Sequence, residues 1–363
     1  MNKEYEQLIV DHDWKALSVL LASLDPFDIS EIMNECSPED GSSILNSLPL
    51  EKATTVFENI TYEVQEELIN ILRSGDLSLL LNRMLSDDRT RLLEKLPPLL
   101  LKKVMKILNP DVSKVTGILL AYEEDSVGRY MSKEYFCVKS DMTVNQSIEF
   151  LRKYAKSSKD RIVNMVYVVD GLGRFINEIN MATLVIANPD EKITDLQDHI
   201  LITLLDTSDI EEAVITFDKY SRFTLPIIDR AGVLVGIITG DDILDISVEE
   251  ATEDMHKMGG MEVLDGAYFD ITLKGMIKKR AGWLSILFVG EMLTATAMGY
   301  FQDEISKAVV LALFIPLIIS SGGNSGSQAT SLIIRSLALG EVKIKDWWRV
   351  FSREIFIGVV LGA

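Results

Sequence analysis

Cysteine and histidine, the side chains of disulfides and zinc sites, are scarce in this 363-residue chain. It has two cysteines, Cys36 and Cys137, and three histidines. The cysteines lie far apart, which argues against a disulfide framework and fits a reducing compartment. We interpret His12 as a surface residue and His256 as a bystander, so a zinc-type site is not expected.

Basic residues are also in deficit. Lys and Arg number 36 against 55 Asp and Glu, a formal net charge of -19. That balance argues against a nucleic-acid partner and favours cations. The N-terminus, MNKEYEQLIVDHDW, lacks the apolar run of a signal peptide, so we expect the soluble part to stay cytoplasmic. No nucleophile, base and orienting group form a set, so we do not expect an enzyme.

One long segment, Ala308 to Ile334, has no charged residue at all. As a helix it reaches roughly 40 Å, more than the ~30 Å of hydrocarbon in a bilayer. Its middle is polar, SSGGNSGSQ. Polar oxygens at that depth are tolerated only against protein or a water-filled path. The residues alone therefore leave two interpretations open, a small-residue packing face and an ion path.

The stretch GGNSGSQATSLIIRSLALGE resembles the signature of the MgtE family of magnesium channels. The resemblance implies a magnesium-conducting homodimer in the cell membrane, with this segment lining the pore. Residue by residue it places Gly323, Asn324 and Ser327 there, although several relatives have Asn where Ser327 stands. A symmetric pore fits a twofold dimer.

The membrane part is predicted to begin at residue 281. Trp283 and Tyr300 mark the interfaces of a first span over 283–301, and basic residues before it place that end inside. A second span covers 308–334 and a third starts at 355. Glu291 is either functional or a protonated carboxyl bonded to a neighbouring helix. Because the family has five spanning helices, we expect 281–363 to be a partial transmembrane domain of an incomplete member.

Residues 1–130 are predicted to form an α-helical superhelix. Short apolar helices recur at intervals of about a dozen residues, and Pro49, Pro97 and Pro110 stand at helix starts. Asp87 and Asp88 open one helix. They are either a charged helix start or, by the resemblance, an acidic position that faces the regulatory domain.

Two βαββα units follow, over 131–194 and 195–254, and they look like a tandem CBS pair. The predicted fold class is thus a multidomain α and α+β membrane protein. The second βαββα unit has the element GIITGDD, in which Thr239 and Asp242 would hold an adenine nucleotide such as ATP. A helix N-cap is the alternative. The first βαββα unit has Asn177, Asn180 and Thr183 at the corresponding positions, so the element is lost there.

Half of the residues from Asp241 to Asp254 are acidic, at helical spacing. Such a run is either a solvated face or an oxygen-only site suited to Mg²⁺. In the MgtE family this helix continues into a connecting helix, here 255–280, that plugs the pore. The resemblance assigns regulatory Mg²⁺ to a set of carboxylates: Asp242, Asp245, Glu250, Glu253, Asp254, Asp209 and Glu211. Ser221 stands where relatives carry Asp, which puts one ion site in doubt.

The sequence thus favours a subunit of a Mg²⁺ channel whose cytoplasmic domains sense Mg²⁺ and close the pore at high concentration. The alternative is a membrane-tethered CBS module that binds adenine nucleotides and transports nothing.

Overall fold

The structure is a computed structural model that describes residues 14–155, 164–196, 201–264, 271–307, 310, 314–338 and 342–362. The chain divides into two compact units, residues 1–243 and 244–363, called here the first and second units. The boundary falls inside helix α15 (Gly240–Met258).

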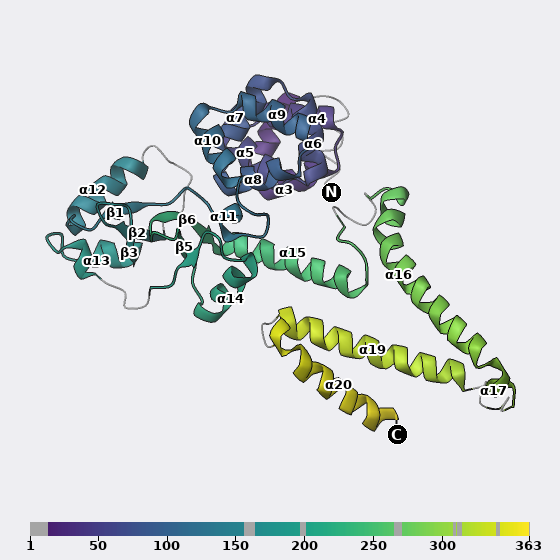
Figure 1. Cartoon of the computed structure of the whole chain (residues 1–363). Coiled ribbons are helices and arrows are strands. Elements are labelled where there is room, and N and C mark those ends of the chain that lie inside the picture. The colour runs from purple at the N-terminus through teal and green to yellow at the C-terminus, as the bar shows by residue number, and fades with distance from the viewer. Residues whose placement is uncertain are drawn as a thin grey trace. The chain divides into compact units, whose positions relative to one another are not determined.

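The first unit begins with helices of nine or ten residues. After α2 (Trp14–Ala22) they are α3 (Pro26–Asn34), α4 (Pro38–Ser47), α5 (Leu50–Asn59), α6 (Tyr62–Ile71), α7 (Ser74–Arg83), α8 (Ser86–Lys95), α9 (Pro98–Ile107) and α10 (Pro110–Leu119). Each of α4 to α10 starts twelve residues after the previous helix. Figure 1 shows them wound into one helical body, in purple and blue.

The same positions of each repeat are buried, which explains the winding. In each of α3 to α8 two adjacent residues are buried, such as Val56 and Phe57 in α5, and the residue between helices, such as Leu72, is also buried. Helices two apart pack together, as α3 does on α5 and α8 on α10. Each fully buried aliphatic side chain contributes about 1.5–3 kcal/mol. The predicted helical superhelix is confirmed.

A second repeated contact fixes the helix ends. The fourth residue of a helix donates to a carbonyl near the end of the preceding helix, which would otherwise lack a partner. Gln65 Nε2 lies 2.7 Å from the Phe57 oxygen, Arg89 Nη1 3.3 Å from the Leu81 oxygen and Ser113 Oγ 3.3 Å from the Met105 oxygen.

Two three-stranded sheets of identical topology complete the first unit. In the first module, β1 (Cys137–Lys139) runs parallel to β2 (Met165–Val169), and β2 antiparallel to β3 (Phe175–Asn180). The second module repeats this with β4 (Leu204–Leu205), β5 (Thr224–Ile228) and β6 (Leu234–Thr239). Helices α12 (Val144–Ala155), α13 (Met181–Ile186), α14 (Ile210–Tyr220) and α15 alternate with the strands, and a short turn, η1 (Ile193–Asp195), follows α13.

The modules pair through equivalent parts. Each β-hairpin turn touches the other: the Phe175 N–H donates to the Gly232 oxygen at 2.9 Å and the Leu234 N–H to the Gly173 oxygen at 3.1 Å. The hydroxyls of Tyr167 and Thr224 lie 2.6 Å apart. The predicted pair of βαββα units is therefore confirmed.

The second unit holds the C-terminal part of α15 and then α16 (Leu273–Tyr300), α17 (Gln302–Lys307), α19 (Ile315–Ala338), η2 (Ile344–Asp346) and α20 (Trp347–Gly362). Within the described residues, α16 is the one helix that is long and apolar enough to cross a membrane.

Helix bounds differ from the expected ones in this unit. The segment 255–280 is not one connecting helix, because α15 ends at Met258 and Gly260 adopts φ +65, a conformation that stops a helix. Its last part belongs to α16 instead. Helix α20 begins at Trp347, before the expected start at 355. Residues 308–309 and 311–313 of the second expected span lie outside the described residues.

Candidate functional site

Asp87 is the most unusual acidic residue of the helical repeat. It occupies the second position of α8, where other repeats have Glu39, Glu51 and Asp111. Those three are exposed, whereas Asp87 is only 3% exposed. The helix-start interpretation holds for the exposed residues, but it does not explain why this one carboxylate is buried.

The chain between the helices and the first module, called here the linker (residues 120–135), covers Asp87. The Ser132 hydroxyl lies 3.3 Å from Asp87 Oδ1 and 3.0 Å from Glu134 Oε2. Glu134 Oε2 also accepts from the Ser86 N–H at 3.1 Å and the Ser86 hydroxyl at 2.6 Å. Ser132 is anchored to the second module, since its N–H donates to the Ile237 oxygen at 2.7 Å.

Asp242 is buried as well, in the first turn of α15. Its carboxylate accepts from the Thr239 N–H at 3.3 Å and from the Thr239 hydroxyl. Burial, with the neighbouring Asp241 and Asp88 carboxylates, raises the pKa of Asp242 to about 6 despite these bonds. Asp242 thus bonds to Thr239, directly before α15, and it is also a buried carboxylate whose charged form is disfavoured.

Asp87, Asp88, Glu134 and Asp242 form one electrostatic group, called here the acidic cluster. Burial raises the pKa of Asp87 well above its usual range, and Asp242, Asp88 and Glu134 raise it further. Like charges gathered in a low-dielectric place destabilise the fold unless a proton or a cation compensates them.

The donors of the acidic cluster are all oxygens, which suits Mg²⁺ rather than zinc. Within the described residues, no three His, Cys, Asp or Glu side chains are arranged to hold one ion. Mg²⁺ is usually held by one or two carboxylates and several retained waters, so Asp87 and Asp242 with water fit its chemistry.

The other predicted carboxylates are more accessible. Asp209 caps α14, accepting from the Glu211 N–H at 2.9 Å, and both residues are exposed. On α15, Asp245 is exposed and Glu250, Glu253 and Asp254 are half-buried. Glu253 pairs with Lys257 one turn later. Ser221 ends α14 with φ 49, the one non-glycine residue at positive φ among those described.

A cavity of about 460 Å³ lies at the first-module counterpart of the Thr239–Asp242 element. Its wall includes Asn180 and Thr183 from the β3–α13 junction and Arg222 and Phe223 from the second module. Arg222 pairs with the buried Glu178 carboxylate at 3.0 Å. We predicted that the nucleotide element is lost here, and this cavity was not foreseen.

The predicted pore residues share one helix. Ser327 lies four residues after Gly323 and three after Asn324 on α19, so the three positions fall on one side of the helix, and all three are exposed. Glu291 lies on α16 and is exposed too.

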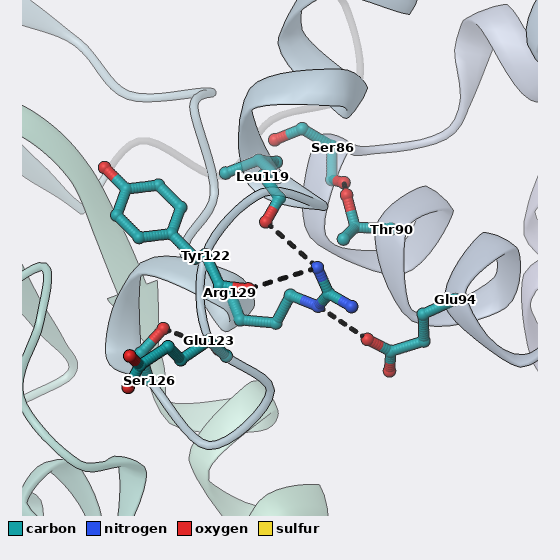
Figure 2. A network of polar contacts seen from close by, with 8 residues as sticks. All are labelled: Ser86, Thr90, Glu94, Leu119, Tyr122, Glu123, Ser126 and Arg129. Carbon is teal, nitrogen blue, oxygen red and sulfur yellow. Dashed lines mark hydrogen bonds and ion pairs between the residues drawn. The ribbon is translucent and has the colours of Figure 1, made fainter.

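The linker also contains a polar joint that the sequence did not reveal, drawn in Figure 2. The buried Arg129 guanidinium donates to Glu94 Oε2 at 2.9 Å and to the carbonyl oxygens of Leu119 and Tyr122, each at 3.4 Å. Its neighbour Gly128 must be glycine, because a Cβ there would lie 2.6 Å from the Asp206 carbonyl oxygen. The joint thus ties α8 to the linker and to the second module.

Comparison with protein families assigns each part. The MgtE intracellular N domain matches residues 24–125, the CBS domain 193–249, and the MgtE divalent cation transporter domain 315–363.

Curated relatives agree with these matches. A magnesium transporter MgtE of Thermus thermophilus is 33% identical over 275 residues, 76% of this chain and 61% of that protein. The chain therefore spans less than two thirds of that relative. A magnesium transporter MgtE of Bacillus subtilis is 26% identical over 371 residues, 100% of this chain and 81% of the relative. Both are named as transporters, which are not enzymes.

Among solved structures, the cytosolic domain of the Mg²⁺ channel MgtE in complex with ATP matches with a TM-score of 0.63 and 28% identity. It covers 68% of this chain and 100% of that one. An N domain, a CBS domain and a transporter domain follow one another in the order of the motifs read from the sequence. The chain belongs to the MgtE family.

Proposed function

We propose that this chain is a subunit of a Mg²⁺ channel whose N domain and CBS pair sense intracellular Mg²⁺ and close the pore when it is high. The buried acidic cluster is the observation that supports sensing. It joins α8 of the N domain, the linker and the second module, so its occupancy bears on how these parts hold together.

The mechanism is electrostatic. Two unit charges ~4 Å apart repel by about 4 kcal/mol at an effective dielectric near 20. Mg²⁺ at Asp87 and Asp242 would offset that repulsion and favour the closed arrangement, while its loss would let α8 and the second module separate. Each ion shifts the balance only by its differential affinity for the two arrangements.

Several sites acting together fit this role better than one. Moving a 1:99 equilibrium to 99:1 takes about 5.5 kcal/mol. The acidic face of α15, with Asp245, Glu250, Glu253 and Asp254, and the α14 start at Asp209 and Glu211 are the further carboxylates we assign to Mg²⁺. Asp88 belongs with the acidic cluster.

Conduction is assigned to the membrane part. We infer that Gly323, Asn324 and Ser327 face the ion path in a homodimer in the cell membrane, with the N-terminal domains in the cytoplasm. The single face they share on α19 and the match to a divalent cation transporter domain support this assignment.

Limited proteolysis of residues 255–274 in the detergent-solubilised full chain tests the sensing proposal. We expect millimolar Mg²⁺ to protect this segment, and to protect it much less in Glu250→Gln/Glu253→Gln/Asp254→Asn. Equal protection of parent and variant at every Mg²⁺ concentration would mean that the α15 carboxylates are a solvated face.

A second proposal concerns ATP, which the related crystal structure contains. The cavity beside Thr183 and Phe223 is the place in this chain for a nucleotide, with the Phe223 ring available for stacking and Arg222 for charge. Calorimetry in the absence of Mg²⁺ should show ATP binding to the parent and none to Thr183→Trp, because the tryptophan side chain fills the cavity. If the variant still binds ATP, Thr239 and Asp242 become the candidate nucleotide site. The membrane-tethered nucleotide-binding module then becomes the favoured function.

A further inference from the structure

Helix α9 of the N domain has an outward face on which every charge is positive. Lys102, Lys103 and Lys106 are exposed, and Leu99 is 87% exposed. These are the second, fifth, sixth and ninth residues of the helix, so they lie on one side of it. Val104, on the other side, has no exposed surface, and α9 contains no Asp or Glu.

The helical repeat does not require a basic residue at these positions. In α6 the second, fifth and sixth residues are Glu63, Glu66 and Glu67, which carry the opposite charge. In α7, which packs on α9, all four positions are uncharged, and Leu79 is 57% exposed. The repeat therefore fixes an outward face but not its charge, and the lysines of α9 are not needed to build the helical body.

The three lysines also lack acidic partners within the chain. Among the described residues, none of them forms an ion pair with a carboxylate. The chain carries a formal net charge of -19, so acidic residues are abundant and a face without them is unusual. Three positive charges thus remain available to an anionic partner.

We propose that the outward face of α9 docks on the anionic headgroups of a lipid membrane. The chain belongs to a family of membrane transporters, and α16 is long and apolar enough to cross a bilayer, so the N domain is tethered to a lipid surface. Lysines beside an exposed leucine suit that surface, because the ammonium groups meet lipid phosphates while the leucine enters the headgroup region.

The exposed leucines favour lipid over the acidic helix α6 of a second copy. The outward face of α6 has Glu63, Glu66, Glu67 and Asn70, and it offers charge but no apolar surface for Leu99. Docking on lipid is also separate from the proposed Mg²⁺ sensing, because no residue of the acidic cluster takes part in it.

Flotation of the full chain with lipid vesicles tests the proposal. The protein, held in phosphatidylcholine nanodiscs with chelator present, is mixed with vesicles of phosphatidylglycerol or of phosphatidylcholine. We expect it to float with the anionic vesicles alone, and to be released in about 1 M salt, where the Debye length is about 3 Å.

Variants of α9 give the size of the effect. Because each lysine near an anionic surface strengthens binding about fivefold, Lys102→Gln/Lys103→Gln/Lys106→Gln should weaken it about a hundredfold. Leu99→Gln should weaken it about tenfold, since it removes the apolar contact. All these residues are exposed, so we expect the thermal unfolding midpoints to match that of the parent.

The matched control removes the same charge from the first module. Lys139, Arg152 and Lys153 are exposed, and Lys139→Gln/Arg152→Gln/Lys153→Gln should bind anionic vesicles within about twofold of the parent. Equal losses in the two triple variants would mean that net charge alone governs binding and that α9 is not the docking surface.

Two further results would overturn the proposal. One is a parent that floats equally with both kinds of vesicle. The other is association of the nanodiscs with one another in the absence of vesicles, lost in the α9 triple variant, because the occupant of the face would then be a second copy. Neither result bears on the Mg²⁺ titration of the acidic cluster.

Discussion

The two CBS modules share one topology but use the same junction differently. Where strand β3 meets α13, the side chains of Asn180 and Thr183 border a cavity of about 460 Å³. Where strand β6 meets α15, Thr239 and Asp242 are bonded to each other, and Asp242 is buried beside the N domain's carboxylates.

The difference follows from what covers each junction. The linker anchors itself to β6 through Ser132, whose N–H and carbonyl bond to Ile237 at 2.7 and 3.0 Å. That contact brings Ser132 and Glu134 to the second module and Asp87 with them. Duplicated elements of identical topology thus differ at the same junction, since one module borders a cavity there and the other contacts the linker from the N domain.

The largest expected effect comes from substituting one residue in each of the two junctions and comparing the Mg²⁺ response of the two variants. Asp242→Asn should raise the Mg²⁺ midpoint for amide protection of residues 84–94 by about tenfold or more, because it removes one charge from the metal ligands. Thr183→Trp should leave that midpoint unchanged. Hydrogen exchange during a Mg²⁺ titration of both variants makes the comparison.

The reverse pattern would contradict this division. If Thr183→Trp shifts the Mg²⁺ midpoint as far as Asp242→Asn does, the two junctions are coupled and the modules do not have separate tasks.

Local sequence patterns predicted the fold well. The structure has the two βαββα units that the sequence predicts, since apolar periodicity and turn residues mark the ends of elements such as helix α14 (Ile210–Tyr220) and strand β5 (Thr224–Ile228). The connecting segment 255–280 was wrong as a single helix. The family resemblance implied a continuous helix there, but α15 ends at Met258 and Gly260 adopts φ +65, and a turn of two residues is a small signal beside a long periodic pattern.

The candidate site was predicted only in part. Asp87, Asp88 and Asp242 came from the family resemblance, whereas Glu134, Ser132, Arg89 and the Arg129–Glu94 pair did not appear in the sequence reading. Ser132, Glu134 and the Arg129–Glu94 pair look like ordinary surface residues in the sequence, because their contacts form where the linker crosses α8, and these parts of the chain are far apart in sequence. A twelve-residue alignment of the repeats gives one available signal, since the fourth helix position is charged at Arg89 and uncharged in the other helices from α4 to α10.

A smaller effect is expected at the joint that holds the N domain to the second module. Arg129→Met should destabilise the first unit by about 2–4 kcal/mol, since it leaves the largely buried Glu94 carboxylate without its cation. Burial already raises the pKa of Glu94 although Arg129 opposes that shift. The thermal unfolding midpoint of the full chain in detergent reports the loss.

The matched control is Arg73→Met. Arg73 pairs with Asp76 at 2.7 Å, but its side chain is 81% exposed, so the loss should stay below about 1 kcal/mol. Adding Glu94→Gln to Arg129→Met should recover part of the stability. Equal losses in Arg73→Met and Arg129→Met would mean that the joint is no more than a surface ion pair.

The smallest expected effect is a pH dependence confined to the second junction. The pKa of Asp242 is raised by burial from 3.8 to about 6, so between these values the folded state binds more protons than the unfolded state. Stability must then rise as pH falls through 6 toward 4. Asp87 shifts in the same direction and adds to the trend.

Asn at position 242 resembles the protonated carboxyl, so Asp242→Asn should be more stable than the parent at pH 7.5 when chelator removes divalent ions. The difference in unfolding midpoint should be on the order of 2–4 °C and should shrink as pH falls below 6. Calorimetric scans of both proteins from pH 5 to 8 measure it. If the difference in unfolding midpoint instead grows as pH falls, Asp242 is stabilised as an anion. The β6–α15 junction of the second module would then be as well solvated as the β3–α13 junction of the first module.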